Sequence, residues 1–125
     1  MIKFLHTRLK VASLEKSISF YEMLGFKCVK KSDSPQGNQL AFMELEGNAH
    51  QIELTHTKDF VPKVPEDLVH TALGVPDLIS YCDGLEKQGI VIWPDGWREK
   101  FKTERKMAFI TDPDGYEVEL LEKLI

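Results

Sequence analysis

The chain has 125 residues, of which 42% are hydrophobic and 29% are charged. That length suits one compact domain, which can bury a core without disulfides or a structural metal. Sixteen lysines and arginines against twenty aspartates and glutamates give a net charge of -4, which argues against a nucleic-acid-binding domain because such domains are usually basic. No apolar run approaches the roughly 20 residues that a membrane-spanning helix needs, and two distant cysteines predict no disulfide framework. We therefore expect a cytoplasmic protein without nucleic-acid or membrane partners.

The first half of the chain predicts a strand, a helix and three further strands. Apolar and polar residues alternate over residues 2–11, as in a strand with one buried face. Ser13 is a good N-cap for the apolar helical pattern that follows, and Gly25 can end that helix. Three short strands are then expected at about residues 26–31, 39–46 and 49–56.

The second half predicts the same order of elements. An alternating strand around His70 comes first, and Asp77 and Gly89 are suited to begin and end the helix that follows. Further strands are expected at about residues 90–93, 106–111 and 116–122. The basic segment 97–106 is expected to be a loop, either solvated or able to close over an anionic substrate.

The two halves are copies of one another. With a shift of 64 residues, seven of the twenty residues over positions 6–25 are identical, where unrelated sequences would share roughly one. Two later matches have slightly larger offsets: Ala41-Phe42 with Ala108-Phe109, and Ile52-Glu53-Leu54 with Val118-Glu119-Leu120. We therefore predict a single domain of two β-α-β-β-β repeats, residues 1–57 and 68–125, joined by a linker over 58–67. The fold class is α+β, with a mostly antiparallel sheet.

A histidine and a glutamate recur at matching places in both copies. Strand alternation places His6 and Glu53, and likewise His70 and Glu119, on the sheet face that the helices leave open. Singly, such residues are more often surface groups than ligands. Two imidazoles and two carboxylates that converge under twofold symmetry form a divalent-metal site suited to Ni, Co, Fe, Mn or Zn. Four protein ligands leave octahedral positions open for water or substrate, as in a catalytic site.

Four segments carry these positions: FLHTRLKVASLEKSISFYEMLGF (4–26), QIELTH (51–56), VHTALGVPDL (69–78) and AFITDPDGYEVELLE (108–122). On them the chain resembles the glyoxalase I (lactoylglutathione lyase) family of the vicinal oxygen chelate superfamily. The resemblance implies a curved sheet and one divalent metal per site, held by the two His–Glu pairs, with Ni or Co favoured. It also implies a homodimer with shared active sites, although the same four ligands could meet within one chain.

The family reaction converts the hemithioacetal of methylglyoxal and a thiol into an S-lactoyl thioester through an enediolate. By resemblance, Glu119 is the principal base that carries the proton, and Glu53 can assist. The residue pattern alone places two glutamates beside one metal and does not choose between them.

The thiol is less well defined than the metal. Lys10 and Thr57 stand where glutathione-using members have an Arg and an Asn, and Arg8 on the same face could compensate for the changes. Lys102 and Lys106 in the basic segment are further candidate substrate ligands. Glutathione and another small thiol therefore both stay open.

Two other activities fit the same pattern. An acyl-CoA epimerase, such as methylmalonyl-CoA epimerase, needs the same stabilisation of an enolate beside a thioester. A metal-free protein of the bleomycin-resistance type would sequester a ligand in the same cleft, but such proteins usually lose the metal ligands that this chain retains.

Overall fold

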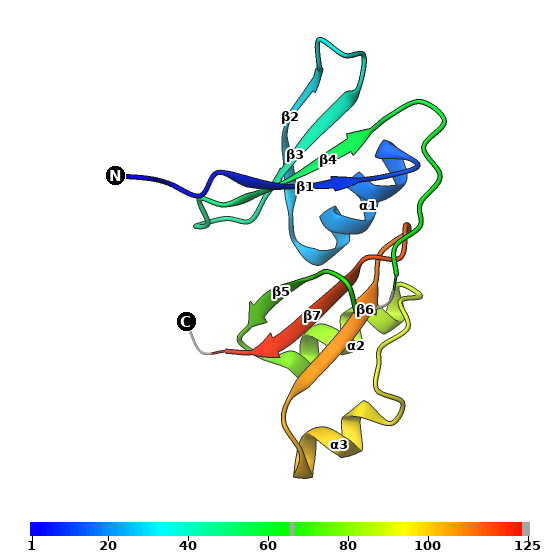
Figure 1. Ribbon diagram of the computed structural model, residues 1–125. Coiled ribbons are helices and arrows are strands. Elements are labelled where there is room, and N and C mark those ends of the chain that lie inside the picture. Colours follow the sequence, from blue (N-terminus) through cyan, green and yellow to red (C-terminus); the bar gives the residue numbers. More distant parts are fainter. Residues whose placement is uncertain (66, 124–125) are drawn as a thin grey trace. The chain divides into compact units, whose positions relative to one another are not determined.

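The computed structural model describes residues 1–65 and 67–123 (Figure 1). The chain divides into two compact units, Met1–Lys63 and Val64–Ile125. The boundary between them falls inside the segment 58–67. That the two repeats make up a single domain stays a prediction.

Unit 1 contains β1 (His6–Lys10), α1 (Leu14–Leu24), β2 (Lys27–Asp33), β3 (Gln39–Glu44) and β4 (Gln51–His56). Its four strands form one sheet in the order β1-β4-β3-β2, in which β1 and β4 are parallel and the other neighbours are antiparallel. Helix α1 packs against β2, β3 and β4. Helix α1 therefore covers one face of the sheet. The strand residues that alternate with the core residues project from the opposite face.

The caps of α1 are those that the sequence predicts. The Ser13 hydroxyl accepts a hydrogen bond from the backbone N–H of Lys16 at 3.3 Å, which satisfies one of the free donors of the first turn. Gly25 has a φ of 118°, a left-handed conformation that glycine adopts without a Cβ clash.

Strand β1 is shorter than expected. Residues 2–5 lie outside it because its parallel partner β4 begins only at Gln51.

Unit 2 contains β5 (His70–Val75), α2 (Leu78–Lys87), α3 (Trp97–Thr103), β6 (Met107–Thr111) and β7 (Glu117–Glu122). Its sheet has the order β5-β7-β6, with β5 and β7 parallel and β6 and β7 antiparallel. Asp77 caps α2 by accepting from the backbone N–H of Ser80 at 3.1 Å. The α+β class is confirmed, and each sheet combines one parallel strand pair with antiparallel pairing.

Two expectations for unit 2 are wrong. Residues 90–93 do not form a strand, and Trp93 makes only an isolated bridge to Phe109, since the following Pro94 has no N–H to continue a ladder. The segment 97–106 is not a loop, because residues 97–103 form α3. Trp97 and Phe101, one helical turn apart, are 3% and 4% exposed. Burial of these two aromatic side chains explains why the segment is helical.

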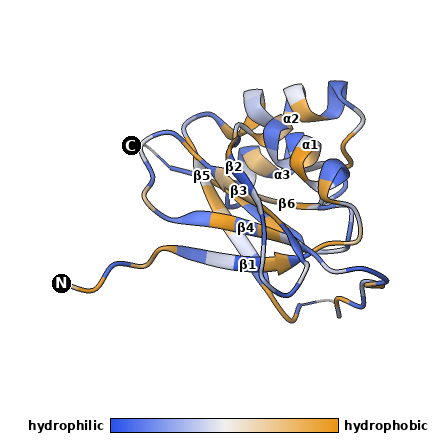
Figure 2. Ribbon diagram, turned by 90° about the horizontal axis from the view of Figure 1, so that it is seen from above, coloured by the Kyte–Doolittle hydropathy of each residue, from blue (hydrophilic) through white to orange (hydrophobic). Residues whose placement is uncertain are grey.

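The core of each unit lies between its sheet and its helices. Leu54 in β4 and Leu120 in β7 are fully buried, as are Tyr21 in α1 and Leu78 in α2. Figure 2 shows both apolar and polar residues within α1 and within α2, as expected of helices with one face on a sheet. Within residues 1–65 and 67–123, no helix is both long enough and apolar enough to cross a membrane.

Candidate metal and substrate site

The first His–Glu pair lies on the open face of the unit 1 sheet. The parallel register of β1 and β4 sets Arg8 opposite Glu53, so His6, two residues earlier on β1, projects from the same face as that glutamate. The Nε2 atom of His6 lies 2.8 Å from Oε2 of Glu53. The strand pairing therefore brings together the two residues that the sequence analysis selected in this half.

Glu53 is buried and firmly held. It is 3% exposed, and its Oε1 atom accepts hydrogen bonds from Nε of Arg8 at 2.6 Å and from the Thr55 hydroxyl at 2.8 Å. Burial on its own would raise the pKa of Glu53, but the bonds from Thr55 and Arg8 and the nearby charges of Arg8 and His6 hold it below its usual range. The carboxylate is thus ionised at neutral pH, as a metal ligand must be.

The second pair lies on the corresponding strands of unit 2. The register of β5 and β7 sets Ala72 opposite Glu119, and His70 projects from the same face. Here Nε2 of His70 lies 3.7 Å from Oε1 of Glu119, which is too long for a hydrogen bond. The Glu119 side chain is 17% exposed, against 4% for that of Glu53. The second pair is therefore more open than the first.

The looser arrangement of the second His–Glu pair has a direct cause in the sequence. Ala72 stands where the first half has Arg8, and Leu121 stands where it has Thr55. Neither can donate a hydrogen bond to a carboxylate. In the described part of unit 2, His70 is the only side chain found in polar contact with the carboxylate of Glu119.

Each histidine also packs against a phenylalanine. The rings of His6 and Phe42 meet edge to face with centroids 5.6 Å apart, and those of His70 and Phe109 do so at 5.7 Å. Neither phenylalanine is among the site residues predicted from the sequence. The sequence contains a signal for them, because Phe42 and Phe109 are matching residues of the internal repeat. Their rings restrict the orientation of both imidazoles.

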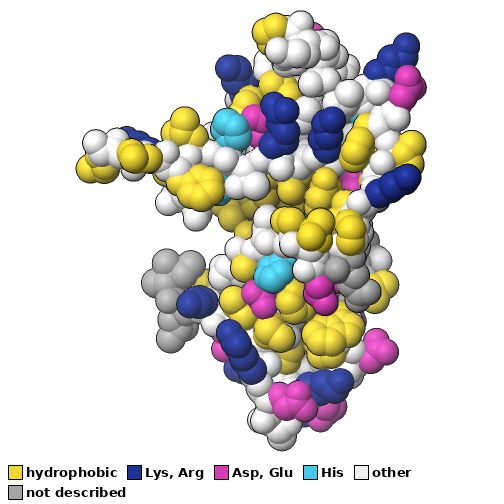
Figure 3. Space-filling view, in the orientation of Figure 1, with side chains coloured by type: hydrophobic (Ala, Val, Ile, Leu, Met, Phe, Trp, Pro, Cys, Tyr) yellow, Lys and Arg dark blue, Asp and Glu magenta, His cyan; other side chains and the backbone are white. Residues whose placement is uncertain are grey.

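A cavity of about 600 Å³ in unit 2 adjoins the second pair. Its apolar wall includes Ile90, Val91, Trp93 and Phe109, and Phe109 is the ring that packs on His70. Figure 3 shows hydrophobic side chains gathered on this face of unit 2. The Trp93 side chain is 56% exposed, so it is available to contact a bound molecule.

Two predicted substrate ligands of unit 1, Lys10 and Thr57, lie at the ends of strands β1 and β4. Lys10 pairs in register with Thr55, and its Nζ lies 5.6 Å from the ring centroid of Phe60. The hydroxyl of Thr57 is buried and has no hydrogen-bond partner in the part of the chain that the structure describes. An unpaired buried hydroxyl is costly, and a polar group of a bound substrate would satisfy it.

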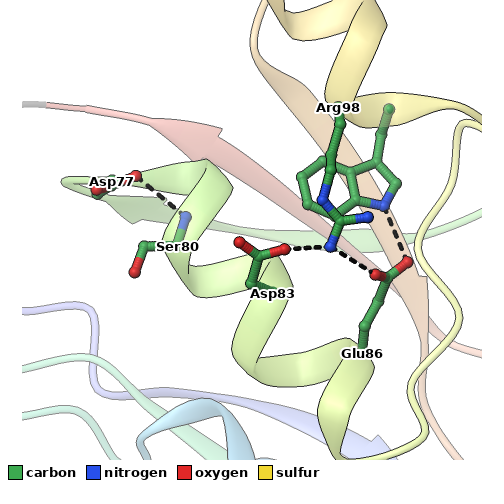
Figure 4. Close-up of polar contacts among 6 residues, drawn as sticks. Asp77, Ser80, Asp83, Glu86 and Arg98 are labelled. Carbon is green, nitrogen blue, oxygen red and sulfur yellow. Dashed lines mark hydrogen bonds and ion pairs between the residues drawn. The ribbon is translucent and has the colours of Figure 1, made fainter.

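The basic segment is folded against α2. Figure 4 shows Arg98 bonded to both Asp83 and Glu86 of that helix, and Nε1 of Trp97 donates to Glu86 at 3.1 Å. The Arg98 guanidinium also stacks over the Trp97 ring, 4.3 Å from its centroid. These contacts attach α3 to α2 and give Arg98 a structural role.

Within unit 2, Lys102 and Lys106 are paired with carboxylates other than Glu119. Lys102 pairs with Glu99 of its own helix at 3.2 Å, and Lys106 pairs with Glu122 at 3.1 Å. Glu122 also accepts a hydrogen bond from the backbone of Leu78 in α2. It therefore lies on the helix side of β7, opposite to Glu119.

The donor atoms of the two pairs fit a divalent metal in kind. Each pair offers one imidazole nitrogen and one carboxylate oxygen, which suit Ni, Co, Fe, Mn and Zn. Among residues 1–65 and 67–123, no group of three or more His, Cys, Asp or Glu side chains lies together as a metal site. Each unit therefore offers two candidate ligands, which are fewer than the three or more protein ligands of a typical catalytic site.

Comparisons with known proteins agree over nearly the whole chain. The family described as the Glyoxalase/Bleomycin resistance protein/Dioxygenase superfamily matches residues 3–120. The chain is 35% identical to a lactoylglutathione lyase of Neisseria meningitidis, covering 98% of this chain and 91% of the relative. It is 38% identical to a probable lactoylglutathione lyase of Synechocystis, covering 94% and 93%. A solved structure of the trypanothione-dependent glyoxalase I of Leishmania major is similar with a TM-score of 0.80 and 32% identity, covering 98% of this chain and 87% of that one.

Proposed function

The chain belongs to the Glyoxalase/Bleomycin resistance protein/Dioxygenase superfamily, and we propose that it is a metal-dependent enzyme of the lactoylglutathione lyase type, the activity for which its relatives are named. It converts the hemithioacetal of methylglyoxal and a small thiol into an S-lactoyl thioester through an enediolate. The observation that carries the proposal is the His–Glu pair, repeated on equivalent strands of both units.

The proposed cofactor is one divalent metal per site, with His6, Glu53, His70 and Glu119 as its ligands. Nickel or cobalt is favoured, and zinc, manganese or iron also suit these donors. The two pairs join at one ion either within one chain or across a homodimer with shared active sites. When bound, the metal supplies a Lewis acid that stabilises the negative charge developing on the two neighbouring substrate oxygens.

The proposed roles of the two glutamates differ. Glu119 takes the proton from one substrate carbon and returns it to the next, because its side chain is the more exposed and is not held by a hydrogen bond. Glu53 is held by Arg8, His6 and Thr55, so it acts chiefly as a fixed metal ligand. It can assist Glu119 in the proton transfer without changing its own position. Phe42 and Phe109 keep the two imidazoles oriented.

The proposed substrate is a small anionic thiol adduct. Lys10, on the Glu53 face, offers a cation to carboxylates of the thiol, and Thr57, just after β4, offers a hydroxyl that has no partner among the described residues. Arg8 uses its Nε on Glu53, while its half-exposed side chain leaves other nitrogens for a substrate oxygen. Lys102 and Lys106 stay predicted ligands whose ion pairs would have to open first. We further propose that the protein acts in the cytoplasm.

The experiment that tests this function is product analysis with a panel of thiols. Metal-loaded protein is mixed with methylglyoxal and glutathione, or with another low-molecular-weight thiol, and the products are identified by NMR. A lactoyl thioester with at least one thiol supports the proposal. Its absence with every thiol, together with epimerisation of a 2-methylacyl-CoA in a parallel sample, would replace it by the epimerase alternative.

A further inference from the structure

Two hydrogen-bond donors meet on a single oxygen of Glu53. Nε of Arg8 lies 2.6 Å from Oε1 and the Thr55 hydroxyl lies 2.8 Å from the same atom. The other oxygen, Oε2, faces His6 Nε2 at 2.8 Å. We propose that Arg8 and Thr55 are positioning residues, which hold Oε1 so that Glu53 binds the metal through Oε2 alone. This inference rests on the proposed function.

The two hydrogen bonds leave Oε1 of Glu53 no room for a third partner. A carboxylate oxygen has about two lone-pair directions, and the two donors take both. Glu53 can therefore bind an ion through one oxygen, next to the nitrogen of His6. A carboxylate fixed in this way would hold a metal in one position next to His6.

The strand register explains how the two donors reach the same atom. Arg8 is directly opposite Glu53 in the parallel pairing of β1 and β4. Thr55 follows Glu53 by two residues on β4, so its side chain lies on the same face. Both Glu53 and Thr55 are buried, at 3% and 0% exposure. A buried carboxylate needs such partners, because an unpaired buried charge is costly.

Unit 2 shows that the repeat does not need these donors to fold. Its parallel pair β5–β7 has the same register around Glu119, yet Ala72 and Leu121 occupy the matching positions. The strands pair there without a donor for the carboxylate. Only Glu53 therefore has the two donors Arg8 and Thr55. These donors fix the carboxylate of Glu53, whereas the carboxylate of Glu119 is freer to move.

The test uses cobalt, whose visible absorption reports its ligand geometry. Metal-free wild type, Arg8→Met, Arg8→Lys, Thr55→Val and Thr55→Ser are titrated with Co²⁺ by calorimetry, and their absorption spectra are recorded. We expect Arg8→Met and Thr55→Val to weaken binding about 10–100-fold, the usual effect of removing a residue that orients a ligand, and to change the spectrum. Arg8→Lys and Thr55→Ser, which keep a donor, should recover much of the affinity.

The control is Arg105→Met, which removes an exposed arginine outside both pairs and should bind cobalt as wild type does. Thermal unfolding of each metal-free variant separates positioning from simple loss of stability. Cobalt affinity and spectrum unchanged in folded Arg8→Met would overturn the inference while leaving the proposed function intact. Wild type that binds no cobalt would overturn both. If Thr55→Val does not fold, the comparison of Arg8→Met with Arg8→Lys still decides the matter.

Discussion

The Nε2 atom of His70 lies 3.7 Å from Oε1 of Glu119, beyond the length of a hydrogen bond. The same two residue types in the first half are 2.8 Å apart. Because the glutamate of the second half has no side-chain donor holding it in the described part of the chain, it can change position at low cost. That freedom suits a carboxylate that must both bind a metal and carry a proton.

Replacing Glu119 by Gln should therefore stop the reaction without unfolding the protein. The amide keeps an oxygen that can bind a metal but cannot accept the proton, so we expect kcat to fall by about 10²–10⁴-fold. The rate of thioester formation is compared with cobalt affinity measured on the same sample. Glu46→Gln, which changes an exposed carboxylate in the turn before β4, is the control for loss of a negative charge. A Glu119→Gln protein within a few-fold of the wild-type kcat would contradict the assignment of the base.

The two tryptophans should respond in opposite ways. Trp97 is 3% exposed and joins α3 to α2, so Trp97→Ala should lower the free energy of unfolding by about 3–5 kcal/mol. Trp93 is 56% exposed on the cavity wall, so Trp93→Ala should cost less than about 1 kcal/mol and raise KM instead. Urea unfolding and steady-state kinetics of both variants test this. Equal losses of stability would show that the two side chains are packed alike.

Glu122 should contribute to the pH dependence of stability. The hydrogen bond from the backbone of Leu78, and then the bond and charge of Lys106, hold the pKa of Glu122 below its ordinary value of 4.5. A carboxyl whose pKa is lower in the folded state stabilises the protein above the unfolded-state pKa, and the contribution disappears as the pH falls through the folded-state pKa. Wild type should thus lose stability between about pH 5 and pH 3 more steeply than Glu122→Gln.

Denaturant unfolding at several pH values measures this difference. Glu46→Gln, which alters an exposed carboxylate in the turn before β4, is the matched control and should follow wild type. Parallel curves for wild type and Glu122→Gln across the acid range would rule out the proposed contribution of this carboxylate.

Removing metal should abolish activity and leave the fold in place. Each unit has a core of fully buried residues that does not depend on the His–Glu pairs, such as Met43 and Leu54 in unit 1 and Leu78 and Leu120 in unit 2. Chelated protein should keep its far-UV circular dichroism, and metal at 100 times its Kd should stabilise it by about 2.7 kcal/mol. Loss of the circular dichroism signal on chelation would mean instead that the metal is structural.

The sequence is sufficient to predict the features that depend on one strand or one helix. Ser13 and Asp77 cap their helices as expected, because a capping bond spans only three residues. Alternation also predicts that each histidine shares a sheet face with its glutamate, and the distances within both pairs confirm it. These are local or period-two relationships, which a single sequence contains in full.

The features that were missed depend on partners distant in the chain. The bond from Arg8 to Glu53 requires the exact register between β1 and β4, and alternation along one strand does not specify register. Helix α3 was missed because its many charges obscured the spacing of Trp97 and Phe101, which are buried in the folded chain. In both cases tertiary contacts decide the outcome.

Metal-dependent lyase activity is tested by the rate of thioester formation of one protein sample in several metal states. The protein is stripped of metal, assayed with methylglyoxal and glutathione, and then reloaded separately with Ni, Co, Mn and Zn, with metal content measured each time. We predict no turnover without metal, recovery with at least one reloaded ion, and a kcat lower by about 10²–10⁴-fold in Glu119→Gln carrying that same ion. Turnover by metal-free protein at the reloaded rate would contradict the account, as would no turnover with any thiol in protein that holds metal stoichiometrically.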